Sequence, residues 1–177
     1  MAALLRKELK KEVFHPNGDR LFAVIEVVTG EQEDERYYLC SSVTNCKEVQ
    51  ITFVKNMISS ENKQFEKITT WYLEDLKLVD GKEANQDNPH FDMHFDKVYG
   101  WESSSTASKY TFVRCLQELN HHYLGKKITF VNFDADFLID TSSILNLDTL
   151  RLQQDGKVQG GRDHCDSEVL EKKELVQ

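Results

Sequence analysis

Long hydrophobic runs and an excess of positive charge are both missing from this sequence. No apolar run approaches the roughly 20 residues that a membrane-spanning helix needs. Lys and Arg number 22 against 30 Asp and Glu, a formal net charge of −8, whereas a general nucleic-acid-binding protein needs the opposite balance. The first thirteen residues lack the uninterrupted apolar centre of a secretory signal. We therefore expect a cytoplasmic protein with neither a membrane span nor a nucleic-acid partner.

Catalytic signatures and cysteine pairs are missing as well. The sequence contains no nucleophile elbow, phosphate-binding loop or dinucleotide fingerprint, so we expect neither an enzyme nor a bound cofactor. No CxxC pair occurs, and a cytoplasmic chain keeps its thiols reduced. Free thiols are therefore predicted at all four cysteines, which are Cys40, Cys46, Cys115 and Cys165.

One segment, HFDMH, has the residue types of a metal site. Strand alternation would place His90, Asp92 and His94 on one face and the apolar residues between them on the other. A strand with a polar outer face gives the same pattern, and no fourth ligand follows nearby. Core packing of the apolar side already explains the alternation, so we predict no metal.

The first residues have helical spacing. Leu5, Leu9 and Val13 recur at four-residue steps, with basic residues elsewhere around the helix, and Pro16 ends the pattern. One interpretation is an amphipathic helix on a membrane surface. The other, favoured because the apolar face is narrow, is a short helix that closes one end of the domain.

Seven short strand-like segments follow. They are LFAVIEVVT, RYYLCSSVT, VQITFVK, FEKITTWYL, DLKLVDGK, FDMHF and KVYGW. Their connections are too short for crossover helices, which favours an antiparallel sandwich or a small barrel over a parallel sheet.

A long helix is predicted from about Ser105 to Leu124, followed by an acidic tail. Ser103, Ser104 and Ser105 can cap its start and Gly125 can end it. Its apolar residues should pack in one core with Trp71; they are Phe112, Val113, Leu116, Leu119 and Tyr123. Residues 134–177 are rich in acidic residues and poor in aromatic ones, which predicts disorder. The alternative for Phe137 to Leu152, which is rich in Leu and Ile, is a helix that packs against a partner.

Three segments carry a resemblance to a known family. WYLEDLKLVDGKEA, NPHFDMHFDKVYGWESSSTASKYTF and LNHHYLGKKITFVNF resemble the N-terminal domain of the exocyst complex component 1 family, and the likeness runs from about Val13 to Phe133. The resemblance implies a mainly β, pleckstrin-homology-like antiparallel barrel of seven strands with a C-terminal helix. The expected division is an N-terminal helix at 1–13, the pleckstrin-homology-like domain at 14–133 and a disordered acidic tail at 134–177.

The resemblance also implies a function and a site. Members of the family bind phosphatidylinositol 4,5-bisphosphate and Rho-type GTPases and help to place a vesicle tether at the plasma membrane. At positions that correspond to basic residues of the family, this sequence retains Arg36, Lys55 and Lys67. These three are the expected lipid-binding residues.

The first hairpin departs from the family pattern. Four acidic residues within 31–35 replace a lysine run, and each cation near an anionic leaflet contributes about 1 kcal/mol. The exchange could weaken membrane binding by about 4 kcal/mol, or roughly a thousandfold. We expect a peripheral exocyst-type module with weak lipid binding. The alternative is a protein-interaction module that has lost lipid binding and engages a Rho-type GTPase or exocyst subunits.

Overall fold

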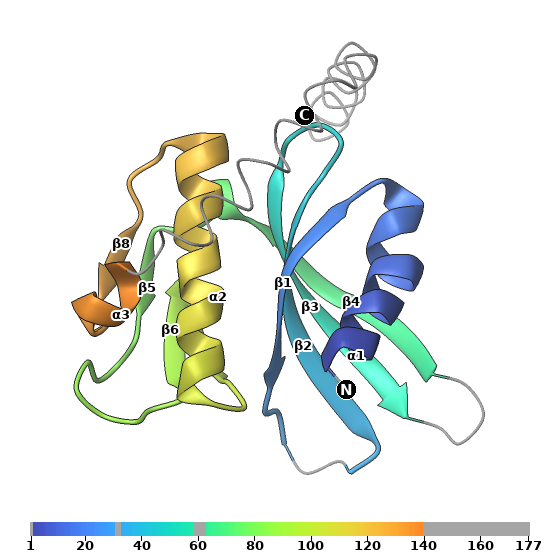
Figure 1. The fold of residues 1–177 in the computed structure, drawn as a ribbon, viewed down its shortest axis with the longest axis horizontal. Helices are drawn as coiled ribbons and strands as arrows, with labels where there is room; N and C mark the ends of the chain where they lie inside the picture. Colours follow the sequence, from blue (N-terminus) through green and yellow to red (C-terminus); the bar gives the residue numbers. More distant parts are fainter. Residues whose placement is uncertain (1, 31–32, 59–62, 140–177) are drawn as a thin grey trace.

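The computed structural model describes residues 2–30, 33–58 and 63–139, which form eight strands in two four-stranded sheets (Figure 1). The first sheet has the order β1-β2-β3-β4 and is antiparallel throughout. The second has the order β7-β6-β5-β8, with β5 and β8 parallel. The bounds are β1 Arg20–Val27, β2 Glu35–Val43, β3 Val49–Ile58, β4 Lys63–Tyr72, β5 Leu78–Asp80, β6 His90–His94, β7 Val98–Glu102 and β8 Thr129–Val131.

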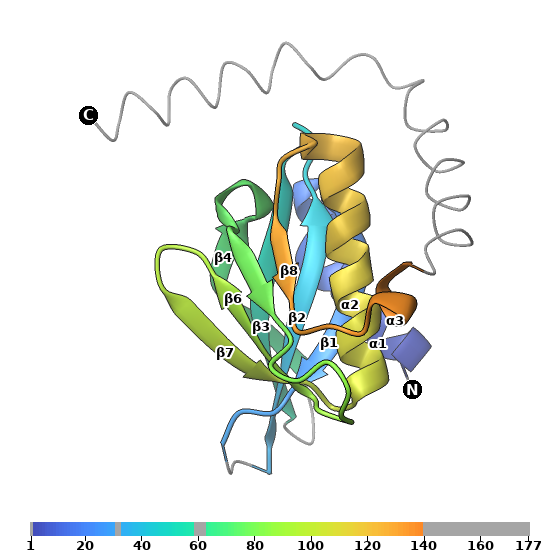
Figure 2. The ribbon, with the colours of Figure 1, turned by 90° about the vertical axis from the view of Figure 1, so that its left-hand side faces the viewer.

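The seven predicted segments form strands, but an eighth strand, β8, pairs in parallel with β5, so the expectation of seven strands that are antiparallel throughout is wrong. The expectation of a closed barrel is wrong. In the described part of the chain the strand pairing between the two sheets is one isolated bridge, Val27 to Ser103. Val28 N donates to Glu102 O at 2.8 Å and Ser104 N to Glu26 O at 3.1 Å beside it. The sheets lie face to face (Figure 2), and a helix between β1 and β6 occupies the side on which a barrel would close.

That helix is α2 (Thr106–Leu119), extended by a π-helical turn η4 (Asn120–Leu124). The Ser105 side chain accepts a hydrogen bond from Ser108 N, and Gly125, at φ 59°, ends the helix in the left-handed conformation. Phe112 and Leu116 are fully buried and Leu119 nearly so, in the cluster against which Trp71 packs. The predicted helix and its core are therefore confirmed.

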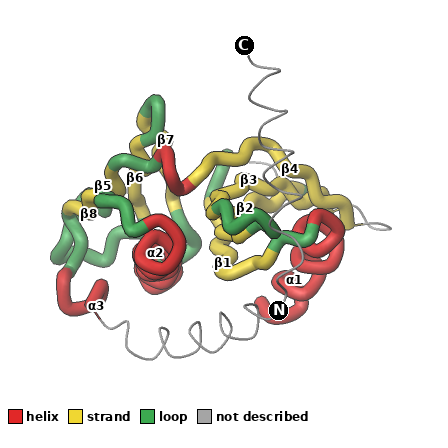
Figure 3. The backbone as a smooth tube through the Cα atoms, turned by 90° about the horizontal axis from the view of Figure 1, so that it is seen from above, coloured by secondary structure: helices red, strands yellow, loops and turns green. Residues whose placement is uncertain are grey.

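The N-terminal helix closes the opposite face of the β1–β4 sheet (Figure 3). It consists of α1 (Ala2–Leu9) and the π-helical turn η1 (Lys10–Phe14), followed by the 3₁₀ turn η2 (His15–Asn17). Leu9 and Phe14 are fully buried and Val13 nearly so, against a second cluster that includes Tyr38, Cys40 and Val54. The prediction of a closing helix is confirmed, because the apolar stripe is used in packing.

Residues after the β8 strand begin the predicted tail. Residues Ala135–Ile139 form the short helix α3, whose Phe137 ring lies 5.9 Å from that of Tyr110. Asp134 N donates a 2.8 Å hydrogen bond to the Tyr110 hydroxyl. The remaining predicted tail, residues 140–177, lies outside the described residues.

The cysteines follow the prediction in part. Cys40 and Cys115 are free, and burial raises the pKa of the Cys40 thiol. Cys46 is disulfide-bonded, so the free thiol predicted there is wrong; spacing along the sequence does not report which residues meet in space. Cys165 lies outside the described residues.

No helix in the described part of the chain is long and apolar enough to cross a membrane.

Candidate functional site

One end of the β1–β4 sheet brings β2 and β3 together beside the largely acidic connection at residues 31–35, which we call the acidic connection. Ile58 N, at the end of β3, donates a 2.9 Å hydrogen bond to Asp34 O, next to the start of β2. Arg36 and Lys55 lie near this end, on β2 and β3. A ligand at this end of the sheet would therefore meet both strands.

Arg36 already has an acidic partner. Its guanidinium lies 2.7 Å from Glu26 Oε1 on β1, and the two side chains are 51% and 37% exposed. This hydrogen bond and the charge of Glu26 raise the pKa of Arg36. A phosphate group would have to compete with Glu26 for the same donors.

Lys55 is paired as well. Its ammonium lies 2.6 Å from Glu35 Oε1, and the Tyr37 hydroxyl donates to the other carboxylate oxygen at 2.6 Å. Glu35 stands at the end of the acidic connection. The hydrogen bond from Lys55, followed by that from Tyr37, lowers the pKa of Glu35. The acidic connection therefore supplies the carboxylate that neutralises this cation.

Lys67 is exposed, beside the N-terminal helix. Its Nζ is 5.4 Å from the centre of the Phe14 ring, a cation–π geometry. The buried carboxyl of Asp19 is close by: burial raises the pKa of Asp19, and the charge of Lys67 opposes that shift. Lys67 therefore contacts a residue of the N-terminal helix that packs on the sheet.

The three predicted residues do not form one cluster. Lys67 pairs with Val54, and Arg36 pairs with Asn56, which places both on the helix-covered face of the sheet. Lys55 lies between Val54 and Asn56 along β3, so it belongs to the opposite face. It pairs with Tyr37, on the face that packs against the β5–β8 sheet. The register needed to see this division comes from the pairing of the strands, which the sequence alone did not supply.

Another basic group was not included in the predicted site. Lys7, Lys10 and Lys11 are exposed on the N-terminal helix. The sequence contained the signal, because these residues lie off the apolar stripe.

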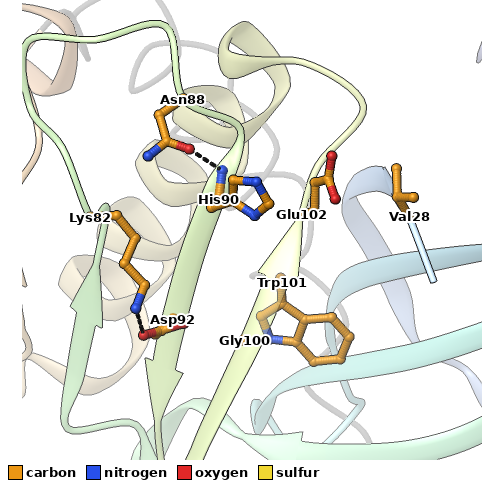
Figure 4. A pocket seen from close by; sticks show the side chains of 8 residues that line it. All are labelled: Val28, Lys82, Asn88, His90, Asp92, Gly100, Trp101 and Glu102. Carbon is orange, nitrogen blue, oxygen red and sulfur yellow. Dashed lines mark hydrogen bonds and ion pairs between the residues drawn. The ribbon is translucent and has the colours of Figure 1, made fainter. Parts of the chain in front are cut away.

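A shallow cavity of about 470 Å³ lies on the β5–β8 sheet. Figure 4 shows the Lys82 side chain directed at Asp92, with which it forms an ion pair, and the His90 ring beside Glu102. Trp101 Nε1 is buried with no hydrogen-bond partner among the described residues. The lining carries charges of both signs, which suits no single class of ion.

The HFDMH segment alternates as predicted. Phe91 and Met93 are fully buried in the core, while His90 is exposed and Asp92 and His94 are half-buried on the other face. The described residues contain no group of three or more His, Cys, Asp or Glu placed to hold a metal ion.

Comparison with known proteins places these observations in a family. Residues 32–122 match the family model described as exocyst complex component SEC3 N-terminal PIP2 binding PH. Mouse exocyst complex component 1-like is 44% identical over 142 residues, which cover 80% of this chain and 81% of that protein. The chain belongs to the SEC3 N-terminal family. Its matched segment contains Arg36, the Lys55–Glu35 ion pair and α2, whereas Glu26, the partner of Arg36, lies before it.

Two longer proteins match this chain over a small part of their length. Mouse exocyst complex component 1 is 39% identical over 134 residues, which cover 76% of this chain and 15% of that protein. The Drosophila melanogaster protein of the same name is 27% identical over 143 residues, which cover 79% of this chain and 16% of that protein. The similarity therefore concerns one domain of those proteins.

Proposed function

We propose that this chain is a non-enzymatic, exocyst-type peripheral membrane module that binds phosphatidylinositol 4,5-bisphosphate weakly. In this proposal it acts in vesicle tethering and exocytosis at the cytoplasmic side of the plasma membrane. Membership of a family described as PIP2 binding supports the lipid class. Similarity to exocyst proteins supports the process.

The weak binding is inferred from the ion pairs of Arg36 and Lys55, the two cations near the acidic connection. Arg36 and Lys55 each have a carboxylate oxygen within hydrogen-bond distance, at 2.7 and 2.6 Å. A cation near an anionic leaflet contributes about 1 kcal/mol, and a neighbouring carboxylate cancels much of that contribution. The proposed lipid-binding residues remain Arg36 and Lys67 on one face of the sheet and Lys55 on the other, so they would contact the membrane as separate cations and not as one headgroup pocket.

The test removes the competing carboxylates. Glu26→Gln with Glu35→Gln frees both cations, and sedimentation with vesicles that contain phosphatidylinositol 4,5-bisphosphate should show binding about tenfold or more tighter than wild type. Adding Arg36→Ala and Lys55→Ala to the same protein is the matched control, and it should abolish the gain. Unchanged binding in the double glutamine variant would contradict the proposal that these pairs limit affinity.

A second candidate is a protein-interaction module without lipid binding, with a Rho-type GTPase or exocyst subunits as partners. The acidic connection with its paired cations favours this candidate, because charge complementarity to a basic partner would raise the association rate. Titration with an isolated GTPase in its GTP-bound form separates the two. Binding to the GTPase combined with no binding to phosphoinositide vesicles would favour the second candidate.

A further inference from the structure

The exposed side of the N-terminal helix carries three lysines. Lys10 and Lys11 follow Lys7 by three and four residues, so both are its neighbours on the helix surface. All three are exposed, while Leu9 and Phe14 on the other side of the helix are fully buried. We call these three lysines the basic ridge.

The basic ridge is free of the pairing seen elsewhere. Arg36, Lys55 and Lys82 each lie against a carboxylate, whereas no ion pair among the described residues involves a ridge lysine. Glu8 and Glu12 flank the ridge on the same helix, Glu8 half-buried and Glu12 exposed. The ridge therefore has more positive than negative side chains facing solvent.

An exposed apolar side chain lies next to the basic ridge. Leu4 precedes Lys7 by one helical turn and is 55% exposed. An exposed leucine next to lysines is the combination with which surface helices contact a lipid headgroup layer: the lysines meet anionic headgroups and the leucine enters the boundary with the acyl chains.

The fold holds this surface in place. The Arg6 guanidinium donates hydrogen bonds to the carbonyl oxygens of Phe22, at 2.8 Å, and Leu21, at 3.3 Å, on β1. The helix is also anchored by its buried apolar side. Binding would therefore require little further ordering of the backbone.

We propose that the basic ridge, together with Leu4, is a contact site for an anionic lipid bilayer that acts separately from the hairpin site. The inference rests on the proposed function as a peripheral membrane module. In this proposal the general electrostatic attraction to the membrane comes from the N-terminal helix and not from the acidic connection. The ridge recognises negative surface charge, which phosphatidylserine supplies as well as phosphoinositides, and it requires no particular headgroup.

The expected contribution follows from the number of charges. One lysine near an anionic leaflet accounts for about fivefold in affinity, so three account for about a hundredfold before salt screening. The same dependence predicts that added salt weakens the contact, whereas the contribution of Leu4 should persist in salt.

The experiment uses the full chain and vesicles of phosphatidylserine in phosphatidylcholine. The variant Lys7→Gln, Lys10→Gln, Lys11→Gln should bind these vesicles at least about tenfold more weakly than wild type and with a smaller dependence on salt. Gln supports a helix about as well as Lys, so the fold should persist, as circular dichroism would check. The control changes three exposed lysines outside the helix to Gln, Lys77, Lys97 and Lys127, which gives the same net charge.

The outcomes separate the basic ridge from the hairpin site. Equal losses in the ridge and control variants would overturn the proposal, because net charge alone would then explain binding. Wild-type binding that requires phosphatidylinositol 4,5-bisphosphate and ignores the ridge changes would overturn it while leaving the proposed function intact. Binding of the ridge region to an acidic protein or to RNA in preference to vesicles would also overturn it. Leu4→Ala should lower affinity in a manner that does not depend on salt.

Discussion

The two sheets of this protein differ in how many of their faces are buried. The β1–β4 sheet has strands of eight to ten residues and is covered by the main core on one face and by the N-terminal helix on the other. The β5–β8 sheet has strands of three to five residues, and its outer face carries His90, Asp92 and His94. The β1–β4 sheet therefore has two buried faces, because the N-terminal helix covers the second one, whereas the β5–β8 sheet has one.

This difference is visible in the residue patterns. From Tyr38 to Val43 six successive residues of β2 are buried, whereas β6 alternates strictly between buried and accessible positions. A strand buried on both faces loses its alternation. Arg36 and Lys55 lie near one end of the β1–β4 sheet, and Lys67 is exposed with its ammonium over the Phe14 ring.

The largest expected effect tests whether the helix-covered face is a true core. Phe14→Ala should lower the free energy of unfolding by about 3 to 5 kcal/mol, because the ring is fully buried between the helix and the sheet. Chemical denaturation measures the loss. Phe137→Ala, at a side chain that is 61% exposed, is the control and should cost much less. Equal losses in the two variants would mean that Phe14 contributes no more than an exposed ring, and that the helix-covered face is not a core.

The next effect concerns the core that both sheets share. Leu116→Ala should destabilise by about 2 to 5 kcal/mol, because Leu116 is fully buried in the cluster that joins α2 to both sheets. The free energy of unfolding in urea is the measurement. A loss below about 0.5 kcal/mol would mean that α2 does not pack where the structure places it.

A buried lysine tests how the β5–β8 side is held. Lys109 on α2 is 1% exposed, and its ammonium donates to the carbonyl oxygens of Gly81, Asn88 and His90 at 2.5 to 3.0 Å. Lys109→Met leaves these acceptors without that donor and should destabilise by about 2 to 3 kcal/mol. Hydrogen exchange should localise the loss to residues 81–90, and uniform exchange across both sheets would contradict this assignment.

The smallest effect lies at the exposed end of the β1–β4 sheet. Because Lys55 and Tyr37 lower the pKa of Glu35, its interactions stabilise the fold above the ordinary glutamate pKa and are lost as the pH falls through the lowered value. Glu35→Gln should therefore be less stable than wild type at pH 7, and the difference should disappear in acid. Urea midpoints measured across this range check the sign. A difference that grows in acid would contradict it.

The sequence predicted the local elements well and their assembly less well. The alternation in HFDMH, the helix cap at Ser105 and the stop at Gly125 depend on near neighbours, and all three are confirmed. The closed barrel was wrong, because closure depends on whether the edge strands of distant segments pair. The disulfide at Cys46 was missed for a similar reason.

The candidate site shows the same division between local and long-range information. The resemblance to the family implies Arg36, Lys55 and Lys67, but their ion pairs and ring contact come from residues on other strands or on the helix. The acidic connection could be seen in the sequence. That Glu35 faces Lys55, and that Glu26 rather than the connection faces Arg36, required the strand register.

The sequence by itself determined the strands, the long helix, the apolar stripe of the N-terminal helix and the resemblance to the family, because periodicity and capping act between residues close along the chain. Only the tertiary structure decided that the sheets stay open, that Lys55 lies on the face opposite to Arg36 and Lys67, and that Lys7, Lys10 and Lys11 face solvent. The physical reason is that a strand exchanges its faces with a shift of one residue. Which face is covered depends on segments that pack from elsewhere in the chain.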